Sequence, residues 1–182
     1  MTVVQATPLD AEKTHLAGLL EAIQRCVYFL DASSQTLKWP IQGDYLLQNK
    51  KDNELFESLA AINERFAKLQ DTLGAAMRHS LILSGEQADS FIKVLAIFEK
   101  AAVIESIEAW QTARAARNLA AHDYETDYNL VADHFNALHE QQAMLNQTAF
   151  RFVSYAEKEL KVTPLSPDFS QEFSQIAQRP CA

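Results

Sequence analysis

The chain has 182 residues and a formal net charge of −8, with 48% hydrophobic and 22% charged residues. This balance is typical of one soluble domain that is long enough to bury a real core. The negative charge argues against non-specific nucleic-acid binding through bulk electrostatics, so any RNA contact is expected to be local and to draw on more than one subunit.

Signals for export or membrane insertion are not evident. The N-terminus has no basic stretch followed by an apolar core, so we expect no secretory signal. No apolar stretch is long enough to cross a bilayer. Cys26 and Cys181 have no metal-ligand spacing and are expected to be free thiols in a reducing cytosol. Together these features predict a cytoplasmic protein without a membrane partner.

Hydrophobic residues recur at alternating spacings of four and three along most of the chain, which is typical of helices packed nearly antiparallel. In chain order, the four apolar stripes are Leu16, Leu20, Ile23, Val27 and Leu30; Leu55, Leu59, Ile62, Phe66, Leu69, Leu73 and Ala76; Phe91, Leu95, Phe98 and Ala102; and Val131, Phe135, Leu138, Leu145, Ala149, Phe152 and Ala156. We predict an all-α fold, an up-and-down bundle of four to five helices. The bundle domain is expected to span 1–161, with 162–182 as a tail in which 168–178 could form one short helix.

Polar residues mark the expected helix starts. The candidate caps are, in chain order, Thr7 or Asp10 with Pro8 in the first turn, Asp52 or Asn53, Ser84 with Gln87 as a capping box, Ser106, and Thr126 or Asp127. The segment 32–51 is expected to be a long crossover, and its length suggests that it holds a short helix.

The informative polar residues lie between 114 and 124, where Arg114, Arg117, Asn118, His122 and Tyr124 follow one another. Arg117 and His122 are five residues apart, so on one straight helix they diverge by roughly 140°. They cannot easily hold the same small group from one helix. Either the helix breaks between them, or the site joins motifs from two chains.

These residue types suit RNA cleavage without a metal. A neutral imidazole at His122 can take the proton from a ribose 2′-hydroxyl, and an imidazolium can protonate the leaving oxygen. The guanidinium of Arg117 can hold phosphate oxygens and stabilise their developing charge. Asn118 could orient the histidine or bind the phosphate, and Arg114 could contact RNA. This route requires no cofactor and leaves a cyclic phosphate and a 5′-hydroxyl.

Other polar clusters have structural explanations. Glu12-x-x-His15 resembles half of a di-metal site, but no second such unit is present, so a solvated helix turn is the more common outcome. His134 and His139 are five apart and would not share a helix face. An Arg and a His at the spacing of the main motif are themselves more often surface residues when nothing else supports them.

The surroundings of the motif supply that support. The stretch from Phe98 to Trp110, followed by Arg114-x-x-Arg117-Asn118-x-x-x-His122-x-Tyr124, resembles the HepT-like ribonuclease toxins of the HEPN family. The segment 65–72 resembles the same family. The resemblance covers most of 54–138, fits the first helix loosely, and has no counterpart beyond Lys161.

The resemblance implies a homodimeric endoribonuclease toxin encoded beside a minimal nucleotidyltransferase (MNT) that acts as its antitoxin. In part of the family the antitoxin attaches AMP to the motif tyrosine, here Tyr124, and silences the toxin. The alternative is a non-catalytic HEPN binding module that is the partner or substrate of such a nucleotidyltransferase. Tyr124 can also bury its ring and expose its hydroxyl at a helix end, which is compatible with its modification.

Overall fold

The computed structural model describes residues 7–87, 89–118 and 126–179. These residues form seven α-helices and a π-helical turn, with no β-strand among them, which confirms the predicted all-α fold. The elements are α1 (Pro8–Ser34), α2 (Gly43–Gln48), α3 (Asn53–Leu83), α4 (Phe91–Lys100), α5 (Ile107–Asn118), α6 (Tyr128–Tyr155), η2 (Ala156–Leu160) and α7 (Ser170–Ala177). The short helices α2 and α7 lie in the crossover and in the tail, where one short helix each was expected.

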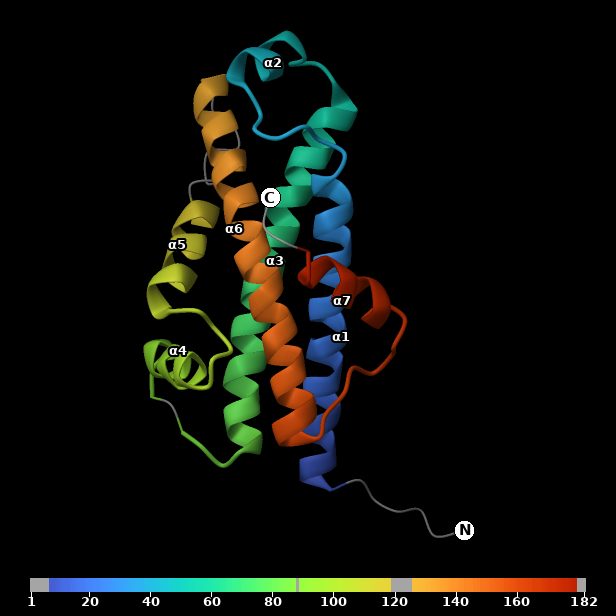
Figure 1. The fold of residues 1–182 in the computed structure, drawn as a ribbon, viewed down its shortest axis with the longest axis vertical. Coiled ribbons are helices and arrows are strands. Elements are labelled where there is room, and N and C mark those ends of the chain that lie inside the picture. Colours follow the sequence, from blue (N-terminus) through green and yellow to red (C-terminus); the bar gives the residue numbers. More distant parts are fainter. Residues whose placement is uncertain (1–6, 88, 119–125, 180–182) are drawn as a thin grey trace.

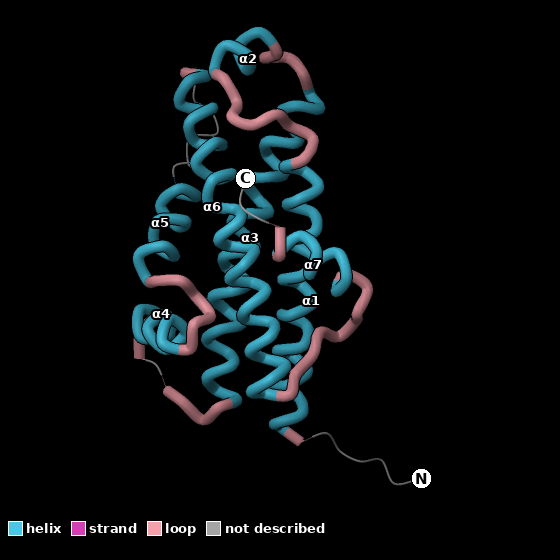
Figure 2. Tube along the Cα trace, viewed as in Figure 1, coloured by secondary structure: helices cyan, strands magenta, loops and turns pink. Residues whose placement is uncertain are grey.

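Three long helices run side by side along the bundle (Figure 1). α1 and α3 are antiparallel, and α6 runs in the same direction as α3. α4 and α5 together make the return path between α3 and α6, on the side away from α7 (Figure 1). The tube drawing in Figure 2 shows α2 across one end of the bundle, and loops along its sides between α4 and α5 and before α7. No helix among the described residues is both long and apolar enough to cross a membrane.

The predicted stripes form the core. Every member of the first two is buried, as are most of the others. Ala102 is an exception, because α4 ends at Lys100 and Ala102 adopts a left-handed conformation with φ of 57°. The amide of Val103 then donates to the carbonyl of Phe98 at 2.9 Å, which closes the helix end. The periodicity extended this helix too far because alanine is itself a good helix former.

Several predicted caps are confirmed. Thr7 and Asp10 form a reciprocal capping box at the start of α1, and Asp52 caps α3. The bond to Thr7 lowers the pKa of the Asp10 carboxyl. The capping box predicted at Ser84 is wrong, because Ser84 ends α3 and α4 begins only at Phe91. Apolar residues before Ser84 stay packed in the core, so α3 continues to Leu83 and no new helix starts at Ser84.

The crossover and the tail are both attached to the bundle. Gly43 starts α2 against α6, where a Cβ atom would meet the Asn129 side chain and stand 2.9 Å from its Cα. Only glycine permits this approach without displacement. In the tail, Phe173 and Ile176 of α7 are buried in the same core as the long helices. α7 packs against α1 and α6.

Candidate functional site

The motif helix α5 is fixed at its first turn by two side chains. The Ser106 hydroxyl accepts a hydrogen bond from the Ala109 amide at 2.9 Å, which confirms the predicted cap. Glu99, from the last turn of α4, accepts from the Ile107 amide at 2.9 Å. Free backbone amides at a helix start need acceptors, and a carboxylate there also interacts favourably with the helix dipole. The start of α5 is therefore held in place relative to α4.

The middle of α5 is joined to α3 by one large side chain and one buried hydrogen bond. Trp110 is buried, while the other buried residues of α5 are the small Ala113 and Ala116. Small residues allow the helix to approach its neighbours closely. The buried Gln70 of α3 donates from Nε2 to the Trp110 carbonyl at 3.1 Å. This bond sets the position of α5 along α3.

The last turn of α5 carries Arg117, which is held by an ion pair with α3. Its Nη1 lies 2.6 Å from Asp71 Oδ1 and 3.5 Å from the carbonyl oxygen of Ala67. The Arg117 side chain is 24% exposed and that of Asp71 is 64% exposed, so the pair lies at the solvent edge of the α3–α5 contact. A guanidinium has five N–H donors in a planar fork, so one carboxylate oxygen leaves others able to bind a phosphate.

The structure places the remaining motif residues only in part. Arg114 and Asn118 are exposed on α5, and Asn118 is its last residue. Arg114 and Arg117 are three apart on one helix, so they lie on neighbouring turns of the same side. His122 and Tyr124 lie outside the described residues. The predicted divergence of Arg117 and His122 on one helix therefore stays a prediction.

Asp71 is the residue to which the sequence analysis gave no role. It is 46 residues from Arg117, and an acidic residue on the polar side of a long helix usually faces solvent. Only the packing of α5 on α3 brings the two charges together. An exposed or half-exposed pair of this kind contributes about 0–1 kcal/mol to stability, so its main effect is to orient the guanidinium.

The Glu12-x-x-His15 unit, predicted to be a solvated helix turn, contacts His79 of α3. His79 of α3 lies with Nε2 3.2 Å from Glu12 Oε2 and 2.9 Å from the Glu12 carbonyl oxygen. The His15 ring packs edge-on against His79, with centroids 4.6 Å apart. Within 7–87, 89–118 and 126–179 no group of three or more His, Cys, Asp or Glu side chains is arranged to hold a metal ion. The contacts join the start of α1 to the end of α3.

A second aromatic arrangement joins the crossover to α6. Trp39 stacks on His139 with ring centroids 4.0 Å apart and donates from Nε1 to the Ser34 carbonyl at 2.9 Å. The Ser34 hydroxyl and His139 Nδ1 are 3.1 Å apart. Burial lowers the pKa of His139, although nearby Glu140 opposes this effect. Trp39 and the buried Trp110 are thus packing residues.

Cys26 is a free, half-buried cysteine on α1. Burial raises the pKa of its thiol, with Glu64 acting in the same direction and Lys68 against it. A thiol that stays protonated is a poor nucleophile and a poor metal ligand. Cys26 packs against the hydrophobic core.

Comparison with protein-family models, with curated proteins and with solved structures gives no match for this chain.

Proposed function

We propose that this protein is a metal-independent endoribonuclease that cleaves RNA through Arg117 and His122, with Asn118 and Arg114 assisting. The observation that supports the proposal best is the placement of Arg117. It lies at the end of α5, immediately before the rest of the motif in the chain, and Asp71 fixes one nitrogen of its guanidinium at 2.6 Å. An arginine oriented in this way is suited to bind a phosphate with its remaining donors.

In the proposed reaction, one neutral imidazole of His122 removes the proton from a ribose 2′-hydroxyl. The 2′-oxygen attacks the adjacent phosphorus, and the bond to the 5′-oxygen breaks. A protonated imidazole gives its proton to that leaving oxygen, so the products are a 2′,3′-cyclic phosphate and a 5′-hydroxyl. Arg117 stabilises the additional negative charge on the phosphate oxygens. Asn118 orients the histidine or binds the phosphate.

The reaction needs one basic and one acidic imidazole, and each chain supplies one His122. We therefore propose a symmetric homodimer in which two motifs share one cleft. The net charge of −8 is consistent with this arrangement, because a local cationic site must be concentrated where the arginines of two chains meet. A monomer at micromolar concentration in analytical ultracentrifugation would contradict the dimer.

The proposed biological role is that of a toxin controlled by an MNT-type nucleotidyltransferase antitoxin in the cytoplasm. AMP on Tyr124 would add a phosphate and a base two residues from His122. The phosphate would compete with RNA for Arg117 and Arg114, and the nucleoside would obstruct the site.

Incubation with purified nucleotidyltransferase and ATP should raise the mass of this protein by one or more AMP units and stop cleavage. Tyr124→Phe should remain active and escape silencing; a label on another residue, or full activity after labelling, would contradict this regulation.

The decisive experiment measures cleavage of single-stranded RNA by the purified protein. Arg117→Ala and His122→Ala should each abolish cleavage. Arg117→Ala should leave the thermal midpoint nearly unchanged, because an ion pair at the solvent edge contributes little stability. His122→Ala should also leave it nearly unchanged, because a polar residue of the proposed cleft contributes little packing. Lys100→Ala is the matched control, since it removes one positive charge from an exposed residue on α4.

EDTA should have no effect on cleavage. Cleavage that requires added Mg²⁺, or that survives His122→Ala, would contradict the mechanism. A stable complex with the nucleotidyltransferase in the absence of any cleavage would instead support the non-catalytic binding module.

A further inference from the structure

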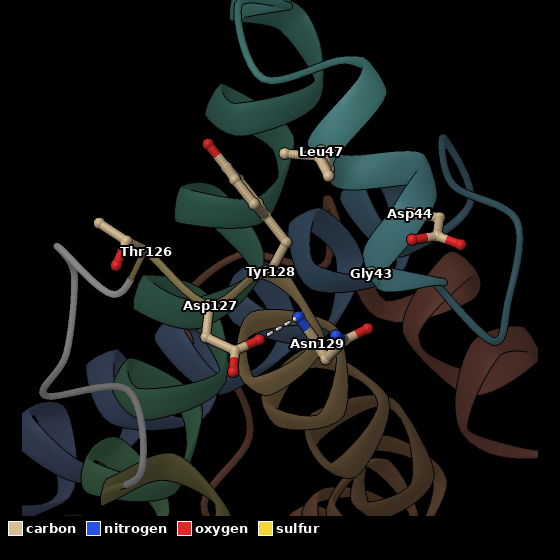
Figure 3. A pocket seen from close by; sticks show the side chains of 7 residues that line it. All are labelled: Gly43, Asp44, Leu47, Thr126, Asp127, Tyr128 and Asn129. Carbon is tan, nitrogen blue, oxygen red and sulfur yellow. Dashed lines mark hydrogen bonds between the residues drawn. The ribbon is translucent and has the colours of Figure 1, made fainter.

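A pocket of about 380 Å³ lies between the start of α2 and the start of α6. We propose that it binds one unstacked nucleobase of the RNA substrate and prefers bases that carry an exocyclic amino group. The inference rests on the proposed function and specifies its substrate. The volume is within the range of small-molecule sites, about 300–1,000 Å³. The lining residues, drawn in Figure 3, are Gly43, Asp44, Leu47, Thr126, Asp127, Tyr128 and Asn129.

The sequence places this pocket next to the motif. Thr126 is two residues beyond Tyr124, so the lining begins where the motif ends. Asp127 then caps α6 by accepting a hydrogen bond from the Asn129 amide at 2.9 Å. On the opposite side, Gly43 allows α2 to approach Asn129 closely. The pocket thus follows the proposed cleavage motif directly in the chain.

The apolar part of the pocket offers a surface for stacking. Tyr128 extends from the start of α6 with its hydroxyl directed away from α2, and Leu47 of α2 points toward its ring (Figure 3). The Tyr128 ring is half-buried and packs against the hydrophobic core, so its position is fixed before any ligand binds. Proteins commonly bind single-stranded RNA by stacking unpaired bases on aromatic side chains.

The polar part of the pocket favours a base over a phosphate. None of the seven described lining residues is cationic, and two of them, Asp44 and Asp127, are carboxylic acids. Carboxylates repel phosphate and accept hydrogen bonds, and the Asn129 amide can donate or accept. Adenine, cytosine and guanine present an exocyclic amine to such acceptors, whereas uracil has only a ring N–H. The negative charge of the lining and the carboxylate of Asp44 thus indicate an amino-bearing base with its phosphates outside the pocket.

The first test measures nucleoside binding to the full-length protein by NMR. Adenosine and cytidine should shift the backbone amide signals of Tyr128 and Asn129 at concentrations at least fivefold lower than uridine requires. Tyr128→Ala should weaken binding about 5- to 150-fold, the range expected for loss of one base–aromatic stack. Tyr128→Phe should retain binding. Tyr45→Ala is the matched control, because Tyr45 lies on α2, is 49% exposed and does not line the pocket.

The second test measures cleavage of uridine tracts that contain a single adenosine or cytidine. Cleavage by the wild-type protein should concentrate next to that nucleotide, and Tyr128→Ala should reduce the preference by at least fivefold. Asp44→Asn should reduce it too; Asp44 is exposed in the first turn of a short helix, so this variant is expected to fold even if Tyr128→Ala does not.

The two tests separate the two proposals. Nucleoside-induced shifts at Tyr128 without RNA cleavage would overturn the ribonuclease and support the base pocket. Cleavage without these shifts, or a cleavage preference that survives both Tyr128→Ala and Asp44→Asn, would overturn the base pocket and leave the ribonuclease intact. Shifts caused by putrescine and not by the nucleosides would show a site for a cationic amine, and would also overturn the inference.

Discussion

The helix α3 makes two contacts of opposite character. Its contact with α1 is an apolar seam in which Leu20, Ile23 and Val27 of α1 are fully buried. Toward α5 it presents Gln70 and Asp71, which bond to the Trp110 carbonyl and to Arg117. The apolar seam removes a large area from water and so provides stability. The polar contact sets the orientation of α5 and Arg117, because hydrogen bonds and ion pairs fix the orientation of the groups that they join.

This difference explains why the candidate site can lie on α5. An arginine at the solvent edge, held by a side-chain carboxylate, keeps donors available for a ligand. The same arginine in the α1–α3 seam would be buried at a high cost. The molecule thus separates the region that makes the bundle stable from the region that orients Arg117.

The largest effect is expected in the apolar seam. Ile23→Ala should lower the free energy of unfolding by about 2–5 kcal/mol, because it removes a fully buried side chain and leaves a cavity. Urea unfolding followed by circular dichroism measures this change. Cleavage per folded molecule should remain near the wild-type value. A loss below about 1 kcal/mol would mean that the α1–α3 seam is not the main source of stability.

The contact between α2 and α6 should be the next most sensitive. Gly43→Ala places a methyl group against Asn129, with its carbon 2.9 Å from the Asn129 Cα, so the helices must move apart at a cost of about 1–3 kcal/mol. Gly18→Ala is the matched control. Its Cβ would lie 3.5 Å from Leu165 Cδ1, an ordinary contact, so this mid-helix change should be neutral or stabilise by up to about 1 kcal/mol. Equal thermal midpoints for the two variants would contradict the close approach.

Replacement of the buried glutamine tests the polar contact. Gln70→Leu removes the hydrogen bond to the Trp110 carbonyl and should cost about 0.5–1.5 kcal/mol. The cost is limited because Gln70 Oε1 has no hydrogen-bond partner among the described residues, and the leucine removes that buried acceptor. Hydrogen exchange should become faster in α5 and change little in α1. Faster exchange in both helices would show that the two contacts are not separate.

The ion pair should affect activity more than stability. Asp71→Asn removes the charge beside Arg117 and should lower the free energy of unfolding by about 0–1 kcal/mol. If Asp71 orients Arg117, cleavage should fall, and Asp71→Glu should restore part of it. Normal cleavage by Asp71→Asn would show that Arg117 does not depend on this contact.

The smallest expected effect is on the pH dependence of stability, through His139 at the contact between the crossover and α6. Burial lowers the pKa of His139 from its ordinary value of 6.5. Below pH 6.5 the unfolded chain binds a proton at His139 more readily than the folded chain does. The stability that a neutral His139 contributes is therefore complete above pH 6.5 and is lost as the pH falls. His139→Phe keeps a ring against Trp39 and should make the dependence between about pH 8 and pH 5 less steep. An unchanged slope would contradict this assignment.

Local patterns of the sequence determined most of the bundle. The spacing of Leu16 to Leu30 and of Leu55 to Ala76 predicted buried helical faces, because a period of 3.6 residues is a property of the backbone and does not depend on neighbours. Thr7, Asp52, Ser106 and Asp127 predicted helix starts because a cap acts within one turn. Ser84 failed as a cap because packing extended α3 to Leu83.

Tertiary structure decided the partners of the polar groups. Nothing near Arg117 in the sequence indicates Asp71, nothing near His79 indicates Glu12, and the pocket of Leu47 and Tyr128 joins segments about 80 residues apart. The residue types at 114–124 suggested a chemistry, since imidazole and guanidinium groups have intrinsic reactivity. Their orientation depends on which helices pack together, and this is set by the sum of many apolar contacts along the chain and by no single local pattern.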